Sequence, residues 1–152
     1  MRYLIRLEDD EALDPALVGH KFASLARAHR AGLPVPPAIV LSVEAHLQFI
    51  GNGEWPSGVL DQVLQTAAEL GISQGLSVRS SATVEDLAGG SFAGQYRTFL
   101  NVRDQIELKE KIEGCWASSG SVARAYYARF SDRDRTVKQK TLMAVILQKM
   151  VQ

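Results

Sequence analysis

The chain has 152 residues, enough for one domain with a hydrophobic core. Apolar residues make up 46% of it and charged residues 22%, a composition that excludes intrinsic disorder. Seventeen basic residues balance seventeen acidic ones, so no overall field attracts nucleic acid or an anionic membrane, and we expect neither as a partner.

The first forty residues predict a strand, a helix and a second strand. Residues 3–7 alternate apolar and polar side chains, which indicates a short strand, and residues 8–15 are acidic and turn-like. From Gly19, apolar side chains recur at helical spacing until Gly32, a natural helix stop. Prolines then exclude helix, and residues 38–41 are expected to form a buried strand.

The middle of the chain predicts two helices. Ser42 is a good N-cap for a helix that carries apolar residues as far as Ile50. Residues 51–58 have the composition of a loop. Residues 59–70 repeat apolar side chains at i, i+3 and i+4, which is typical of an amphipathic helix, and the glycines that bound residues 71–75 end it.

The last third predicts two more helices and a final strand. Residues 105–116 and 121–130 have helical spacing, and residues 131–140 form a charged, exposed turn. The apolar run at 141–152 is typical of a central strand buried on both faces. The order of elements predicts an α/β (α+β) fold with a mixed sheet and flanking helices. Because no closing element follows the last strand, residues 1–152 are expected to form a single partial domain.

The chain lacks the sequence features of an exported or membrane protein. Its N-terminus, MRYLIRLEDDEALD, has no apolar core of signal-peptide length, and no apolar run approaches the length of a membrane span. The one cysteine, Cys115, cannot form an internal disulfide, so we expect a cytoplasmic location. We interpret Cys115 as a small buried hydrophobe rather than a reactive thiol.

Two predicted strands flank a glycine-rich loop in residues 77–102, SVRSSATVEDLAGGSFAGQYRTFLNV. Arg79 stands at the end of the first strand and can fork onto phosphate oxygens. Short hydroxyl side chains and glycines follow it, which suit a polyanion such as a triphosphate: Ser80, Ser81, Thr83, Gly89, Gly90 and Gly94. On pattern alone, a surface hairpin with an ordinary exposed arginine is the commoner interpretation, and the spacings of the P-loop and of G-x-G-x-x-G are absent.

Two further segments have groups that suit a nucleotide. Lys21 lies at the predicted start of a helix, where its charge could meet a phosphate, although a solvated lysine is the commoner outcome. In the final strand, an extended backbone could present an N–H and a C=O to an adenine edge while Met150 and Val151 pack on the ring. A plain core strand is the better interpretation without outside information.

The sequence predicts no metal site within this chain. The histidines, His20, His29 and His46, lack metal-ligand spacing, and we interpret them as structural or surface residues. The acidic pair Glu85 and Asp86 could approach a magnesium ion bound to phosphates, but such pairs more often keep a loop soluble.

These pieces occur in an order that resembles the N-terminal ATP-binding region of the pyruvate phosphate dikinase, phosphoenolpyruvate synthase and rifampin phosphotransferase family. The resemblance rests on GHKFASLARAHRAGLPVPPAIVLS at 19–42, on VRSSATVEDLAGGSFAGQYRTFLNV at 78–102, and on CWAS and AVILQKMV further along. It covers roughly residues 18–152. The long middle motif is specific, so it favours a phosphate-binding loop over an ordinary surface hairpin.

The resemblance implies the first lobe of an ATP-grasp fold, with ATP lying between two lobes. It assigns phosphate contacts to Lys21 and to Arg79, and Arg79 the catalytic role of neutralising charge on the transferring phosphoryl group. It places the glycine-rich phosphate loop around residues 91–95, covering the triphosphate, and the adenine hinge at 148–151. The implied ATP-binding residues are Lys21, Arg79, Ser91, Gly94, Gln95, Thr98, Gln148, Met150 and Val151.

The sequence also departs from the family pattern. His20 replaces a glycine before the motif lysine, and Ala38 stands where the family has glycine. The sequence ends at the implied hinge, so we expect the second lobe, the phosphohistidine domain and the acceptor domain to be absent from it. The implied cofactors are ATP and Mg²⁺, with the magnesium ligands mostly in the missing lobe. In the absence of that lobe, we expect an apolar, exposed face around residues 143–151 that favours self-association or pairing with a separate chain.

The implied function is that of the ATP-binding lobe of a phosphoenolpyruvate synthase-like dikinase. The intact enzyme would transfer the β-phosphoryl group of ATP to a histidine and then to pyruvate, whereas the isolated chain should be inactive and bind nucleotide weakly at most. Two alternatives stay open. One is the equivalent lobe of a rifampin phosphotransferase-like enzyme, and the other is a degenerate nucleotide-binding module without catalysis.

Overall fold

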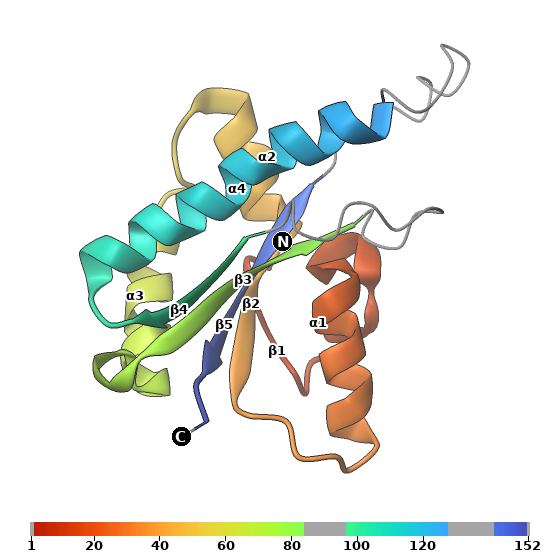
Figure 1. Ribbon diagram of the computed structural model, residues 1–152, viewed down its shortest axis with the longest axis vertical. Helices are drawn as coiled ribbons and strands as arrows, with labels where there is room; N and C mark the ends of the chain where they lie inside the picture. The colour runs from red at the N-terminus through yellow and green to blue at the C-terminus, as the bar shows by residue number, and fades with distance from the viewer. Residues whose placement is uncertain (1, 84–96, 128–141, 152) are drawn as a thin grey trace.

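A computed structural model describes residues 2–83, 97–127 and 142–151 of the chain, and the side chains of 118–127 are not described. Figure 1 shows the arrangement of the elements. The strands are β1 (Leu4–Arg6), β2 (Ala38–Leu41), β3 (Leu76–Ala82), β4 (Thr98–Val102) and β5 (Met143–Lys149). The helices are α1 (Pro15–Arg30), α2 (Val43–Asn52), α3 (Val59–Leu70) and α4 (Gln105–Tyr127), with short 3-10 turns η1 (Asp10–Leu13) and η2 (Ile72–Gln74).

The five strands form one sheet in the order β1-β2-β5-β3-β4. The last strand, β5, is central, and the side chains of Met143 to Leu147 are buried, which confirms the predicted central strand. The expected α/β class with flanking helices is also confirmed. The sheet is not mixed in the described part, however, because β5 inserts between β2 and β3 and runs antiparallel to both, as every other described pair does.

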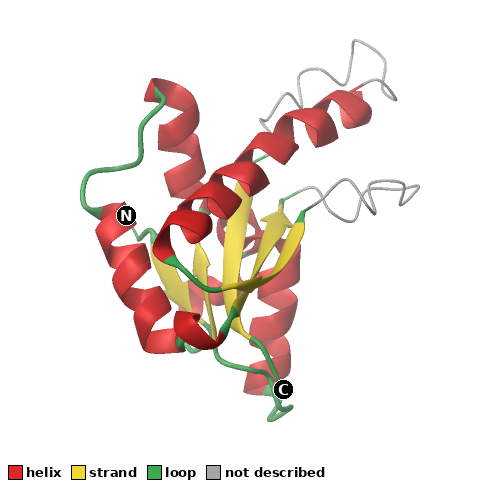
Figure 2. Ribbon diagram, turned by 60° about the vertical axis from the view of Figure 1, so that its left-hand side comes forward, coloured by secondary structure: helices red, strands yellow, loops and turns green. Residues whose placement is uncertain are grey.

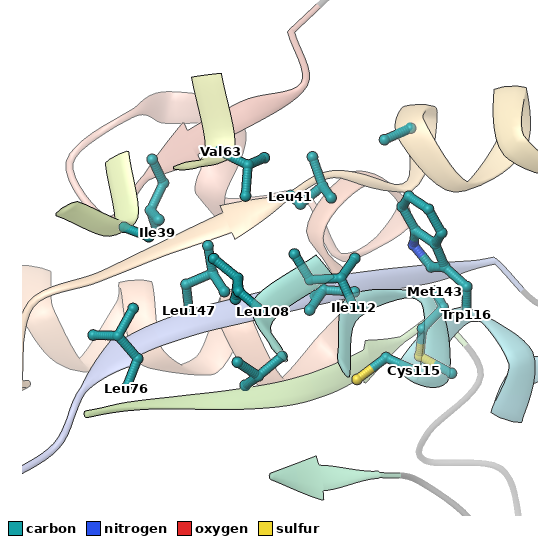
Figure 3. Close-up of a cluster of buried hydrophobic side chains, with 14 of the residues drawn as sticks. Ile39, Leu41, Val63, Leu76, Leu108, Ile112, Cys115, Trp116, Met143 and Leu147 are labelled. Carbon is teal, nitrogen blue, oxygen red and sulfur yellow. The ribbon is translucent and has the colours of Figure 1, made fainter. Parts of the chain in front are cut away.

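Helices cover both faces of the sheet, as Figures 1 and 2 show from two directions. Along β5, Ala144 and Ile146 pack with residues of α1, including Phe22. Val145 and Leu147 belong to a second cluster, built with α3 and α4, because successive side chains of a strand point to opposite faces. Figure 3 shows side chains of this second cluster meeting between the sheet and the helices.

We predicted an exposed apolar face around residues 143–151, and this prediction is wrong for most of that stretch. Met143 to Leu147 are buried because helices pack on both sides of β5. Val151, just beyond the strand, is 77% exposed. The burial of this segment removes the reason for which we expected self-association through it. Self-association itself stays a prediction.

Helix α1 has a kink that sets the position of its second half. It begins at Pro15, earlier than predicted, because the Asp14 side chain caps it by accepting the N–H of Ala16 at 3.0 Å. Gly19 then interrupts the helix with φ 78° and ψ 163°. A Cβ at Gly19 would overlap the carbonyl oxygen of Ser81, so only glycine allows the helix to approach β3 this closely.

Most other predicted elements match the structure. The strand at 38–41 and the helix at 59–70 have the predicted bounds. The two helices predicted between 105 and 130 are one helix, α4. Ser42 precedes α2 as expected but makes no capping bond, because its Oγ donates to the carbonyl of Arg2 at 2.9 Å. The charged turn predicted at 131–140 lies outside the described residues. No helix in the described part is both long and apolar enough to cross a membrane.

Candidate functional site

A pocket of about 270 Å³ lies where β3, β4 and the end of β5 meet. Five of the nine predicted ATP-binding residues line it: Arg79, Thr98, Gln148, Met150 and Val151. Strand register brings them together, because Arg79 pairs with Thr98 on β4 while its neighbour two residues back, Ser77, pairs with Gln148 on β5. Paired residues of antiparallel strands point to the same face, so these side chains converge.

Arg79 is held in the pocket by a short relay of hydrogen bonds. Its Nη2 donates to Oε1 of Gln148 at 2.9 Å, and Nε2 of Gln148 donates to the carbonyl oxygen of Pro36 at 3.1 Å. Because the carbonyl can only accept, it fixes which way the amide points and turns Oε1 towards Arg79.

The guanidinium of Arg79 retains binding capacity. Its Nε is buried and has no hydrogen-bond partner among the described residues, and no carboxylate in that part of the chain forms an ion pair with it. A half-buried guanidinium without a carboxylate partner favours an anionic ligand, and its planar fork of donors suits phosphate oxygens.

Lys21 contacts β3 beside Arg79 and His20 contacts the residue after the strand, but neither lines the pocket. Lys21 Nζ donates to the carbonyl of Ser80 at 3.3 Å, and His20 Nε2 donates to the carbonyl of Thr83 at 3.0 Å. Both side chains come from the start of the second half of α1, just after the kink. The structure thus brings the predicted lysine to the residue that follows Arg79 in β3, and its role towards phosphate stays a prediction.

The hydroxyls of Ser80 and Ser81 do not face a ligand, contrary to our interpretation of the sequence. Both residues are fully buried. Ser80 Oγ donates to the carbonyl of Arg97 at 3.2 Å and accepts its N–H at 3.0 Å. Ser81 Oγ donates to the carbonyl of Val18 at 2.8 Å and accepts the N–H of Phe22 at 3.2 Å. These hydroxyls join β3 to Arg97 and to α1, because α1 packs directly on this part of the strand.

Several predicted residues lie outside the described part of the chain: Ser91, Gly94 and Gln95 of the phosphate loop, with Gly89, Gly90, Glu85 and Asp86. Among the described residues, no group of three or more His, Cys, Asp and Glu side chains could hold a metal ion. We therefore assign no magnesium ligand to the described residues.

His46 and Cys115 have the structural roles that we expected. His46 is buried, its ring stacks on Trp116 with centroids 5.8 Å apart, and its Nδ1 accepts the N–H of Met143 at 2.8 Å. Burial lowers its pKa to about 4, so the ring is neutral at physiological pH. Burial also raises the pKa of Cys115 to about 12, which keeps the thiol protonated and unreactive.

Sequence reasoning missed four residues that line the pocket: Pro36, Ser77, Leu100 and Lys149. The alternation of strand side chains could have found Ser77 from Arg79, and Leu100 from Thr98. Lys149 follows Gln148 directly. Pro36 had no local signal, because its place depends on the pairing of β2 with β5, which joins segments more than one hundred residues apart.

The comparisons with known proteins agree on one family. The model of the family described as "Pyruvate phosphate dikinase, AMP/ATP-binding domain" matches residues 47–152. The prodigiosin synthesizing transferase PigC of Serratia marcescens is 36% identical, over 97% of this chain and 18% of that protein. The phosphoenolpyruvate synthase of Aeropyrum pernix is 32% identical, over 89% of this chain and 21% of that protein. The uncharacterized phosphotransferase YvkC of Bacillus subtilis is 33% identical, over 70% and 15% respectively. The chain spans about one fifth of the length of these relatives.

Proposed function

Because the chain belongs to the pyruvate phosphate dikinase family of AMP/ATP-binding domains, we propose that the pocket formed by β3, β4 and β5 is its nucleotide site. The observation that carries this proposal is the convergence of Arg79, Thr98, Gln148, Met150 and Val151 in that pocket. We further propose that the domain is the first lobe of an ATP-grasp fold.

At the phosphate end of the site, we assign Arg79 to the phosphate oxygens of ATP. Its guanidinium would stabilise the negative charge of the phosphoryl group that is transferred. Lys21 would add a second positive charge from the start of the second half of α1, where the helix backbone also contributes positive potential. Ser91, Gly94 and Gln95 complete the proposed phosphate contacts, and Thr98 stands beside Arg79 on β4.

At the base end, the residues after Lys149 would hold adenine. The N–H of Lys149 already donates to the carbonyl of Pro37 at 2.9 Å, so it is occupied within the sheet. The backbone groups that meet the adenine edge would therefore come from Met150 and Val151, whose apolar side chains can also pack on the ring. Gln148 would take part through the hydrogen bond that orients Arg79.

The complete reaction requires parts beyond this chain. We propose that the intact enzyme transfers the β-phosphoryl group of ATP to a histidine of a phosphohistidine domain and then to pyruvate. Several relatives are named phosphoenolpyruvate synthase, which supports pyruvate as the acceptor. Magnesium would arrive with the nucleotide phosphates. A cytoplasmic location is also part of this proposal. It is supported by Cys115, which is a free thiol, since free thiols are typical of reducing compartments.

The acceptor has a second candidate. PigC, whose name describes a transferase of prodigiosin synthesis, is 36% identical to almost the whole of this chain, so the acceptor need not be pyruvate. A phosphotransferase of the rifampin type would use the same ATP lobe with another acceptor. A non-catalytic module would keep the fold but would not use Arg79 and Lys21 to bind phosphate.

Titration calorimetry with ATP tests the site. Arg79→Ala should weaken binding by about tenfold or more, because a hydrogen bond to a charged group contributes roughly 1.5–3 kcal/mol. Lys21→Ala should weaken it in the same direction. Arg6→Ala and Lys109→Ala remove exposed charges of β1 and α4 and should leave the affinity unchanged. Equal affinity of wild-type chain, Arg79→Ala and Lys21→Ala would reject the proposed site in favour of the non-catalytic module.

A further inference from the structure

Met150 lies between two hollows at the end of β5. It lines the proposed nucleotide pocket, and it also lines a second pocket of about 210 Å³ together with Gln74, Gly75 and Lys149. Met150 and Lys149 are the two residues that line both hollows, and Met150 is the less exposed of the two. Methionine is unbranched and flexible, so a wall made of it keeps its place only if something holds the thioether.

Asn101, on β4, contacts the thioether of Met150. Its backbone N–H donates to Sδ of Met150 at 3.1 Å. Asn101 has φ 62° and is the one residue other than glycine with a positive φ in the described part of the chain. The register between β3 and β4 shifts close by, between Leu76 and Val78. Irregularities of this kind re-aim groups next to binding sites, and a backbone outlier is a reason to look for a function.

The unusual conformation of Asn101 is itself supported from two sides. Arg103 Nε donates to Oδ1 of Asn101 at 2.9 Å. On the other side Gly75 leaves room for the same oxygen, because a Cβ at Gly75 would overlap it. Gly75 has φ 100°, which also favours glycine there. Arg103 and Gly75 thus support the conformation in which the Asn101 N–H meets the sulfur of Met150.

We infer that Asn101 is a positioning residue that fixes Met150 as the partition between the two hollows and so limits the size of the base that the nucleotide pocket accepts. The inference rests on the proposed function for its ligand. If the hold on the thioether is lost, Met150 can swing and the pocket opens towards Gln74 and Gly75. A base with an extra fused ring would then fit better relative to adenine.

The first test reads the side chain without any nucleotide, by NMR of methyl-labelled methionine in the 152-residue chain. Asn101→Val should release Met150, because a β-branched residue disfavours positive φ. Asn101→Gly is the matched control: it loses the Oδ1 bond to Arg103, but glycine adopts a positive φ without strain and keeps the N–H. We expect a Met150 methyl with one fixed conformation in the wild type and in Asn101→Gly, and a rotamer-averaged methyl in Asn101→Val. The same methyl behaviour in all three would overturn the inference.

The second test compares the Kd of ATP with that of etheno-ATP, whose adenine carries an extra fused ring. Asn101→Val should shift the ratio towards etheno-ATP by about two- to fivefold, the range that a weak hydrogen bond supports. Met150→Leu removes the sulfur acceptor but keeps an apolar side chain, and it should shift the ratio of the two Kd values in the same direction. This variant replaces Asn101→Val in the test if Asn101→Val fails to fold. Equal weakening of both nucleotides would mean a merely structural role and overturn the inference. Absence of binding by the wild-type chain, with the methyl effect intact, would reject the proposed function alone.

Discussion

The side-chain amide of Gln148 links two segments of the chain by hydrogen bonds. It accepts from Arg79 and donates to the carbonyl of Pro36, and it is almost fully buried. Gln148→Leu should therefore lower the free energy of unfolding by about 1–3 kcal/mol, because it leaves buried polar groups without partners. Urea denaturation measures this, with Gln65→Leu on the exposed side of α3 as the control. An equal effect of the two substitutions would show that the relay contributes nothing to stability.

His46 predicts a pH dependence of stability. Its pKa falls from 6.5 to about 4 on folding, so between these values the unfolded chain binds more protons than the folded one. The stability from the neutral ring is therefore complete above pH 6.5 and declines as the pH drops towards 4, by about 3 kcal/mol in total. Urea unfolding at about pH 7.5 and about pH 4.5 measures the loss.

The control for this titration is His46→Gln, whose side chain can still accept the N–H of Met143 but has no proton to gain. Carboxylates contribute the same pH slope to both proteins, so the difference between them isolates the imidazole. The same loss of stability on acidification in wild type and in His46→Gln would contradict the assignment.

At the scale of elements, the kink of α1 rests on Gly19. Gly19→Ala should destabilise the chain by roughly 2–4 kcal/mol, because the new Cβ overlaps the Ser81 carbonyl in addition to the strain of positive φ. Gly32→Ala is the matched control, since Gly32 has φ 83° but open space around it, and it should cost only about 1–2 kcal/mol. Thermal unfolding of both variants measures the difference, and equal losses would show that close packing of α1 on β3 is not required.

The same elements show what the sequence could predict. The helix at 59–70 and the strand at 38–41 have local signals, namely periodicity and flanking prolines or glycines, and their predicted bounds are right. The sheet order depends on β5 pairing with segments far away in the chain, which no local pattern contains. For the site, the family motif predicts Arg79 and Gln148, and the structure brings both into one pocket, while their role towards a nucleotide stays a prediction. Ser80 and Ser81 were misread because the packing of α1 on β3 is a tertiary event.

At the scale of the whole molecule, the described part of the chain offers one positively charged side of the proposed nucleotide site. Arg79 and its neighbours form an open pocket at the end of one sheet, and the described residues contain no metal-binding cluster. Phosphoryl transfer needs metal ions and charged groups arranged around the transferring group on several sides. As part of the proposed function, we predict that the 152-residue chain binds ATP but does not turn it over.

Two measurements on the same sample separate binding from catalysis. ATP in large excess should raise the thermal midpoint of the wild-type chain, since a ligand that binds only the folded state stabilises it by RT ln(1 + [L]/Kd). Arg79→Ala should lose most of that shift, because it removes the cation that holds the phosphates. Release of phosphate should stay at the level of ATP in buffer for both proteins. Sustained ATP consumption by the wild-type chain, abolished in Arg79→Ala, would show that one lobe suffices for the reaction.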